Sequence, residues 1–293
     1  MNTPLLDREE YIEQTYFFRV YRERLKENLP AQEILATIGE EVLATTNLPH
    51  ALDFLRGEIL LTGKVSDGMA LLSHYFTPFQ TFVMSKAEAD KSRFDQKVAL
   101  EVLQRHAEYL AKSPTAVGLF IYQFECIARN RLGYDHGMQA IAADPFFDED
   151  WQDWILKTRL RLGTTDFADL IYFRSEHYVN VRRRRTGQND YQASYPIFFG
   201  LQEGRIAKAN RDKDPLFMFA ALQRQLGYPA VPRAKLRVTE PIIHPALEHR
   251  LQRLEKRLKI LESEVKGEFD LSKFYAKPQD FSGNHTSGDE KTD

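Results

Sequence analysis

Apolar residues recur at helical spacing through the first 175 residues of the chain. Leu52, Leu55 and Ile59, for example, fall on one face of a segment that Pro49 begins and Gly63 ends. We expect a mainly α-helical domain, a multi-helix orthogonal or array arrangement, over residues 1–175. The same pattern predicts helices over residues 7–25, 30–43, 49–63, 66–75, 78–91, 94–111, 115–130, 135–143, 148–162 and 165–174.

Acidic residues mark two of the predicted helix starts. Asp7 followed three residues later by Glu10 is typical of a capping box. The trio Asp148, Glu149 and Asp150 places negative charge where the helix dipole is positive.

The pattern changes over residues 176–240. His177–Val181 and Ile197–Leu201 have the composition of strands, and Gln202–Gly204 is typical of a three-residue hairpin turn leading into Arg205–Ala207. We therefore predict a small β-hairpin in this second region. One further helix, from Pro215 to Gly227, and a proline-rich linker over residues 229–245 complete it.

Residues 241–267 carry a heptad pattern. Apolar residues alternate at spacings of four and three, as in the a and d positions of a coiled coil: Leu247, Leu251, Leu254, Leu258, Leu261 and Val265. In a parallel pair, Arg250 would meet Glu255 and Arg257 would meet Glu262 of the second chain, whereas an antiparallel pair would bring like charges together. The pattern predicts a parallel homo-oligomer, either a dimer or a trimer. The alternative is that the same stripe packs on the chain's own helical domain.

The amino-acid composition indicates the class of protein and the compartment to expect. The 293 residues are 43% hydrophobic and include a single cysteine, Cys126, which favours a globular fold in a reducing compartment. Neither a signal peptide nor an apolar stretch of membrane-spanning length is evident, so we expect a cytoplasmic protein with no membrane partner. Residues 268–293 are polar, and we expect them to be disordered.

Charge is unevenly distributed along the chain. Twelve basic and four acidic residues lie between Arg182 and Arg237, a net charge of +8, whereas the whole chain carries −2 and the remainder therefore −10. This asymmetry indicates either an anionic partner or an internal contact with the acidic helical domain. The candidate anion-binding residues are Arg182, Arg183, Arg184, Arg185, Lys208, Arg211 and Lys213.

Aromatic residues follow the four arginines at Tyr191, Tyr195, Phe198 and Phe199. Interleaved cations and aromatics suit single-stranded nucleic acid, because phosphates pair with the charges and bases stack on the rings. The alternative is a solvated arginine loop followed by aromatics that fill a core.

Catalytic and cofactor motifs are not evident in the sequence. The segment Gly57–Lys64 has five residues between its glycines where a phosphate loop has four, and Val65 replaces the required Ser or Thr. We expect His74, His106 and His136 to be surface or interhelical hydrogen-bonding residues, and Cys126 to be a buried apolar group. We expect neither a metal nor a cofactor. If the protein is an enzyme, its polar site residues would be Glu58, Tyr122, Glu125, Arg129 and Asn130.

These features favour a non-enzymatic binding or scaffold protein. It would self-associate through the C-terminal coiled coil and present the basic region to an acidic protein. A nucleic-acid-associated protein using the arginine-rich segment is the first alternative, and an enzyme with a site between the helices is the second.

Overall fold

The computed structural model describes residues 4–27, 29–90, 92, 94–233, 250, 253–259 and 261–262. The chain divides into two units, Met1–Lys235 and Leu236–Asp293. The linker beyond residue 233, the heptad residues Leu247, Leu251 and Val265, and the tail 268–293 lie outside the described residues.

The expectation of a mainly α-helical protein is confirmed, and the described residues contain no β-strand. A short 3-10 turn, Leu25–Glu27, follows the first helix. The α-helices of the first unit are α1 (Arg8–Arg24), α2 (Ala31–Glu41), α3 (Leu48–Thr62), α4 (Val65–Leu71), α5 (Pro78–Ala87), α6 (Gln96–Leu110), α7 (Ala116–Asn130), α8 (Tyr134–Ala142), α9 (Glu149–Arg161), α10 (Phe167–Tyr172), α11 (Glu176–Thr186), α12 (Leu201–Ala209) and α13 (Pro215–Leu226).

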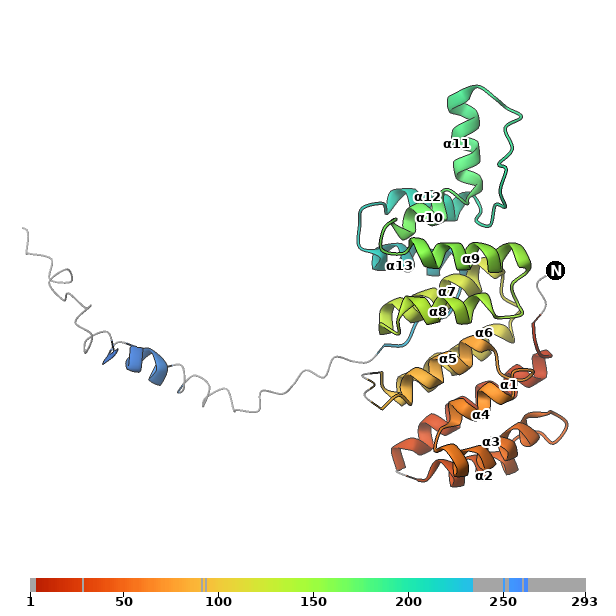
Figure 1. Cartoon of the computed structure of the whole chain (residues 1–293), viewed down its shortest axis with the longest axis vertical. Coiled ribbons are helices and arrows are strands. Elements are labelled where there is room, and N and C mark those ends of the chain that lie inside the picture. The colour runs from red at the N-terminus through yellow and green to blue at the C-terminus, as the bar shows by residue number, and fades with distance from the viewer. Residues whose placement is uncertain are drawn as a thin grey trace, which may run out of the picture. The chain divides into compact units, whose positions relative to one another are not determined.

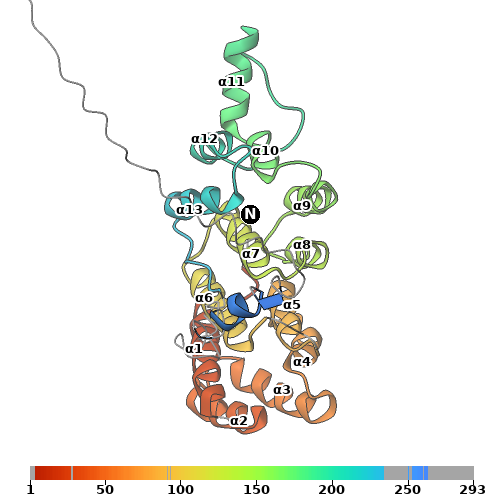
Figure 2. The same cartoon turned by 90° about the vertical axis from the view of Figure 1, so that its left-hand side faces the viewer.

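Within the first unit the helices form an array (Figure 1). Helix α1 packs along α6, while α2 packs on α3, α8 on α9, α10 on α12, and α13 on α7. The array runs from α2 and α3 at one end to α11 at the other, and α11 projects beyond the stacked helices (Figures 1 and 2). Helix α11 therefore extends outside the stack formed by the other helices of the first unit.

Helix starts follow from short polar side chains. Asp148 accepts a hydrogen bond from the Trp151 amide at 3.0 Å, as the acidic trio predicts. A capping box does form, but at Thr77 and Gln80 and not at Asp7, whose side chain makes no capping bond.

The Glu10 carboxylate, which the sequence assigned to that capping box, has another role. It is nearly buried and accepts hydrogen bonds from the Asn47 amide and the Tyr75 hydroxyl, each at 2.7 Å. Glu10 therefore ties α1 to the start of α3 and to the turn before α5.

One hydrophobic core runs through the first unit. Around α7 it is largely aromatic: the Phe124 ring stacks on Phe167 at a centroid distance of 3.9 Å, and the Phe120 ring lies 5.0 Å from Trp154. Phe199, which follows α11 in the chain, is buried in the same cluster. The projecting end of the array is thus anchored in the core.

The predicted β-hairpin is wrong. His177–Val181 lies inside α11, and Gln202–Gly204 and Arg205–Ala207 lie inside α12. In a hairpin turn Gly204 would supply a positive φ, but in the structure it is helical and its lack of a side chain leaves space for a neighbouring element. A Cβ there would lie 2.6 Å from the Ser175 Cβ and 2.7 Å from the His177 Cβ. Glycine therefore allows α12 to approach the start of α11 closely.

The apolar run Ile197–Leu201 also differs from its predicted strand. Its central amides, those of Phe198 and Phe199, both donate to the Arg174 carbonyl, and Ser175 and Phe199 form only an isolated bridge. The run is apolar because Phe199 enters the core, and not because it pairs with a second strand.

In the second unit, residue 250 and residues 253–259 and 261–262 are helical. Leu254, Leu258 and Leu261 are each 58% exposed. The charged heptad residues Arg250, Glu255, Arg257 and Glu262 are exposed as well.

We predict opposite effects of alanine at two helical glycines. Gly204→Ala should lower the free energy of unfolding by about 1–3 kcal/mol, because the new methyl group overlaps Ser175 and His177. Gly57→Ala in α3, where a Cβ meets nothing within 4 Å, should raise it by about 0.5–1 kcal/mol. Urea unfolding followed by circular dichroism measures both. Equal effects at the two positions would contradict the close approach of α12 to α11.

Candidate functional site

Helix α11 is a short helix with a defined start and end. The Ser175 hydroxyl accepts a hydrogen bond from the Tyr178 amide at 3.3 Å, and Gly187 ends the helix with a φ of 70°. Its last turn carries Arg183, Arg184 and Arg185, where positive charge interacts favourably with the helix dipole.

After Gly187 the chain runs back along α11 to the core. We call residues 188–197 the return segment, and arginine side chains hold it to α11 near the tip and near the base of the helix. Near the tip, Arg183 Nε donates to the Tyr191 carbonyl at 2.8 Å, and the Arg182 guanidinium lies 4.4 Å from the Tyr191 ring centroid. Near the base, Arg174 Nη1 donates to the Pro196 carbonyl at 3.1 Å, and its guanidinium lies 4.5 Å from the centre of the Tyr195 ring.

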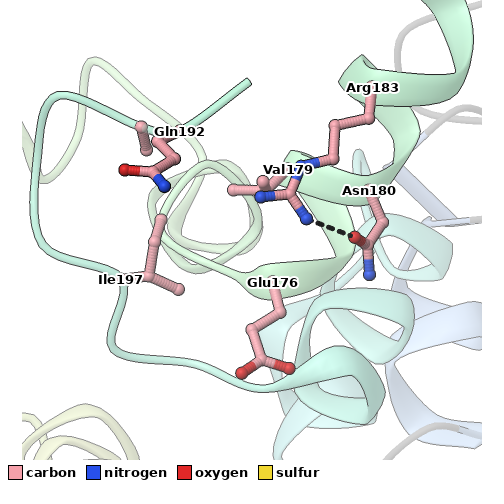
Figure 3. A pocket seen from close by; sticks show the side chains of 7 residues that line it. Glu176, Val179, Asn180, Arg183, Gln192 and Ile197 are labelled. Carbon is pink, nitrogen blue, oxygen red and sulfur yellow. Dashed lines mark hydrogen bonds between the residues drawn. The ribbon is translucent and has the colours of Figure 1, made fainter. Parts of the chain in front are cut away.

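Between these two fastenings a cavity of about 450 Å³ separates α11 from the return segment. Its helical wall consists of residues at positions i, i+3, i+4 and i+7, and residues 192, 193 and 197 form the opposite wall (Figure 3). The lining residues are Glu176, Val179, Asn180, Arg183, Gln192, Ala193 and Ile197.

Arg183 gives this cavity a positively charged group with a fixed position. Its Nη1 lies 3.5 Å from the Asn180 Oδ1, in addition to the bond from Nε to Tyr191. A guanidinium has five N–H donors, and these bonds use only two of them. The remaining donors are available to an anion in the cavity.

A second positive group lies where α11 meets α12. Burial lowers the pKa of His177, and the nearby charges of Lys208, Arg205 and Arg184 lower it further. The three cations therefore lie near His177, and all three are exposed. We call His177, Arg184, Arg205 and Lys208 the junction cluster.

The structure disperses the seven predicted anion-binding residues. Arg182 and Arg183 hold the return segment, as described above, whereas Arg184 and Arg185 are exposed on α11. Lys208 belongs to the junction cluster and lies 6.0 Å from the Tyr172 ring centroid.

The last two of the seven are occupied within the chain. Arg211 forms an ion pair with Asp169 at 2.5 Å and lies 4.3 Å from the Tyr172 ring centroid. Lys213 donates to the Ala209 carbonyl at the end of α12 at 2.7 Å.

The four aromatic residues that follow the arginines also make contacts within the chain. Tyr191 and Tyr195 stack under arginines, and the Phe198 ring packs 4.5 Å from Trp151. Phe199 is buried. The interleaving of cations and aromatics in the sequence is thus explained by contacts within the chain.

Sequence reasoning missed Glu176, Asn180, Gln192 and Arg205. The i to i+7 relation of Glu176 and Arg183 appears only once this segment is recognised as a helix. The signal for a helix was present in Ser175 and Gly187, which suit its N-cap and C-cap.

The residues named for the enzyme alternative make structural contacts. The buried Tyr122 hydroxyl donates to the Val102 carbonyl at 3.0 Å, and the buried Glu125 accepts bonds from Arg129 and Tyr228. Asn130 Nδ2 donates to the Pro232 carbonyl at 3.0 Å. Glu125 and Asn130 thereby fasten residues 228–232 across α7, and Glu58 lies elsewhere, on α3.

Histidine and cysteine side chains occupy ordinary structural positions. His74 and His136 are exposed, whereas His106 of α6 is buried and lies 3.1 Å from the side-chain nitrogen of Gln123 in α7. The same nitrogen donates to Asp144 at 3.1 Å, and burial raises the pKa of Asp144 to about 6. Cys126 is buried, which raises the pKa of its thiol.

Comparisons with known protein families, curated proteins and solved structures find no match for this chain. Across the part of the chain that the structure describes, no helix has the length and apolarity needed to cross a membrane. In the same residues, no group of three or more His, Cys, Asp or Glu side chains is placed to hold a metal ion.

We predict that His106 makes folding sensitive to acid. Burial lowers its pKa from 6.5 to about 3, so below about pH 6.5 the unfolded chain binds a proton that the folded protein does not bind. Relative to His106→Phe, the wild-type protein should lose about 3 kcal/mol of stability between about pH 7 and about pH 4.

The Asp144 carboxyl titrates in the opposite sense, because it binds its proton in the folded state first, and this contribution is present in both proteins. Urea unfolding at a series of pH values gives the difference. Parallel stability profiles for the two proteins would show that His106 is not buried in its neutral form.

Proposed function

We propose that the protein is a non-enzymatic binding protein whose projecting helix α11, together with α12, engages an acidic protein partner. The observation that carries this proposal is a set of exposed cations that form no ion pair within the part of the chain that the structure describes. Among the described residues, Arg184, Arg185, Arg205 and Lys208 form no ion pair.

The distribution of charge along the chain also supports an acidic protein partner. The net charge of +8 between Arg182 and Arg237 raised the alternative of an internal contact with the acidic helical domain. Arg211 makes such a contact with Asp169, but the four unpaired cations do not. Positive charge that is exposed on a projecting element raises the association rate with an acidic partner.

A protein partner is favoured over single-stranded nucleic acid because of the aromatic residues. Tyr191 and Tyr195 each stack with an arginine of the same chain, and Phe198 and Phe199 pack against tryptophans. The bases of a nucleic acid would therefore need to displace contacts that hold the fold. Nucleic-acid association remains the second candidate, on the basis of the same cations.

We also propose that the protein self-associates through the heptad segment. The exposed Leu254, Leu258 and Leu261 form the described part of the a and d stripe, and a parallel partner would cover them. The exposed Arg257 and Glu262 fit attractive pairing between parallel chains.

The first experiment measures binding of fluorescein-labelled polyglutamate by anisotropy at low ionic strength. Replacing Arg184, Arg185, Arg205 and Lys208 together by Gln should weaken binding by about tenfold or more. The matched control replaces Arg56, Lys97, Lys112 and Lys157 by Gln, which removes the same charge elsewhere on the surface. It should change binding by less than about twofold.

Equal losses in the two variants would show that only the net charge matters and would contradict the proposal. A single-stranded oligonucleotide serves as the second probe. If it binds at about 50 mM salt and polyglutamate does not, the nucleic-acid alternative is correct.

Light scattering tests self-association. The full chain should have a mass that is a multiple of 34.1 kDa, and a chain ending at Thr239 should be monomeric. Arg257→Glu should weaken the assembly, and adding Glu262→Arg should restore it if the chains are parallel. Monomeric mass for the full chain would rule out the coiled coil.

A further inference from the structure

We propose that the cavity between α11 and the return segment binds an extended peptide segment that carries one carboxylate and one cation about three residues apart. This inference rests on the proposed function, because it specifies which part of the acidic partner α11 recognises. The cavity differs from the junction cluster in having both charge signs on its wall.

Arg183 would bind the carboxylate of the ligand. Its guanidinium is held by the Tyr191 carbonyl and Asn180, so little conformational freedom is lost when an anion binds. Its other N–H groups offer the paired donors that match a carboxylate.

Glu176 would bind the cation of the ligand. It occupies the first position of α11 and lines the same cavity, and its carboxylate is exposed and forms no ion pair among the described residues. Figure 3 shows Glu176 and Arg183 on the same helical wall, separated along the axis of α11.

The middle of the cavity suits a peptide backbone. Val179, Ala193 and Ile197 supply apolar surface, and Asn180 and Gln192 supply side-chain amides from the two facing walls. The Asn180 amide nitrogen and the Gln192 side chain make no hydrogen bond among the described residues, so they are available to peptide groups. The volume of about 450 Å³ accommodates a few residues.

The positions of Glu176 and Arg183 on α11 indicate the spacing expected in the ligand. Seven residues of α-helix separate their backbone positions, which is a rise of about 10 Å along the axis. A polyproline II segment rises about 3.1 Å per residue and repeats every three residues, so side chains at i and i+3 lie on one edge about 9 Å apart. An extended segment with opposite charges at i and i+3 therefore fits both ends.

Glu176 also argues against a phosphate chain in this cavity. A second phosphate that followed one bound at Arg183 would approach the Glu176 carboxylate and be repelled. The preferred ligand is therefore dipolar and not purely anionic.

The experiment uses the full-length protein and four capped tetrapeptides with Pro-Pro between the end residues. Two are dipolar, with Glu and Lys ends in either order, one is diacidic with Glu at both ends, and one is dibasic with Lys at both ends. Binding is followed by the NMR shifts of the Asn180 and Gln192 side-chain amides. We expect at least one dipolar peptide to bind about threefold or more tightly than the diacidic peptide, with a dissociation constant below about 10 mM.

Glu176→Lys should reverse this preference, so that the diacidic peptide binds most tightly. The matched control is Glu149→Lys, because Glu149 is exposed at the first position of α9 just as Glu176 is at that of α11. The control should retain the wild-type preference. Thermal unfolding monitored by circular dichroism shows that both variants are folded.

Two outcomes overturn the inference. One is that the Asn180 and Gln192 amides do not shift with any dipolar peptide, and the other is that Glu176→Lys leaves the order of affinities unchanged. If the wild-type protein still binds polyglutamate and the variant at Arg184, Arg185, Arg205 and Lys208 does not, only the dipolar ligand is wrong. If the wild-type protein binds neither polyglutamate nor a dipolar peptide, the proposed function itself has failed.

Discussion

Packing of the half-buried Phe198 and the buried Phe199 against Trp151 and Trp154 is the interaction on which the arrangement of α11 depends. Each phenylalanine ring centroid lies 4.5–5.8 Å from each tryptophan ring centroid, so the chain must return to the core between the end of α11 and Phe198. Because the two phenylalanine amides also bond to the Arg174 carbonyl, the base of α11 is fixed to the array. The base of the projecting helix is therefore held by the core.

The positive charges of this region fall into two groups with different physical roles. Arg174, Arg182 and Arg211 stack on aromatic rings, where the guanidinium contributes to holding the fold. Arg184, Arg185 and Arg205 have no such partners among the described residues, and Lys208 lies 6.0 Å from the Tyr172 ring centroid. A count of arginines and lysines therefore overstates the binding surface, because the stacked arginines are occupied within the chain.

Helical periodicity was sufficient to predict α1 to α10 and α13, because an apolar stripe and its end residues are local signals. The hairpin prediction failed because the same residue types satisfy two patterns: Gly204 suits a turn by its φ range and suits α12 by its lack of a side chain. Which of these applies depends on Ser175 and His177, which are distant in sequence. The cavity could not be predicted from the sequence for the same reason, since its two walls come together only in the folded arrangement of α11 and the return segment.

The return segment has one feature with an evolutionary consequence. Among the described residues, no backbone hydrogen bond joins residues 192–194 to α11, and the contacts that hold the return segment lie at Tyr191, Tyr195 and Pro196. This stretch can therefore change in sequence, or gain a residue, at little cost to folding. Selection for a new partner would act most freely there, while the arginines and phenylalanines on either side would diverge slowly.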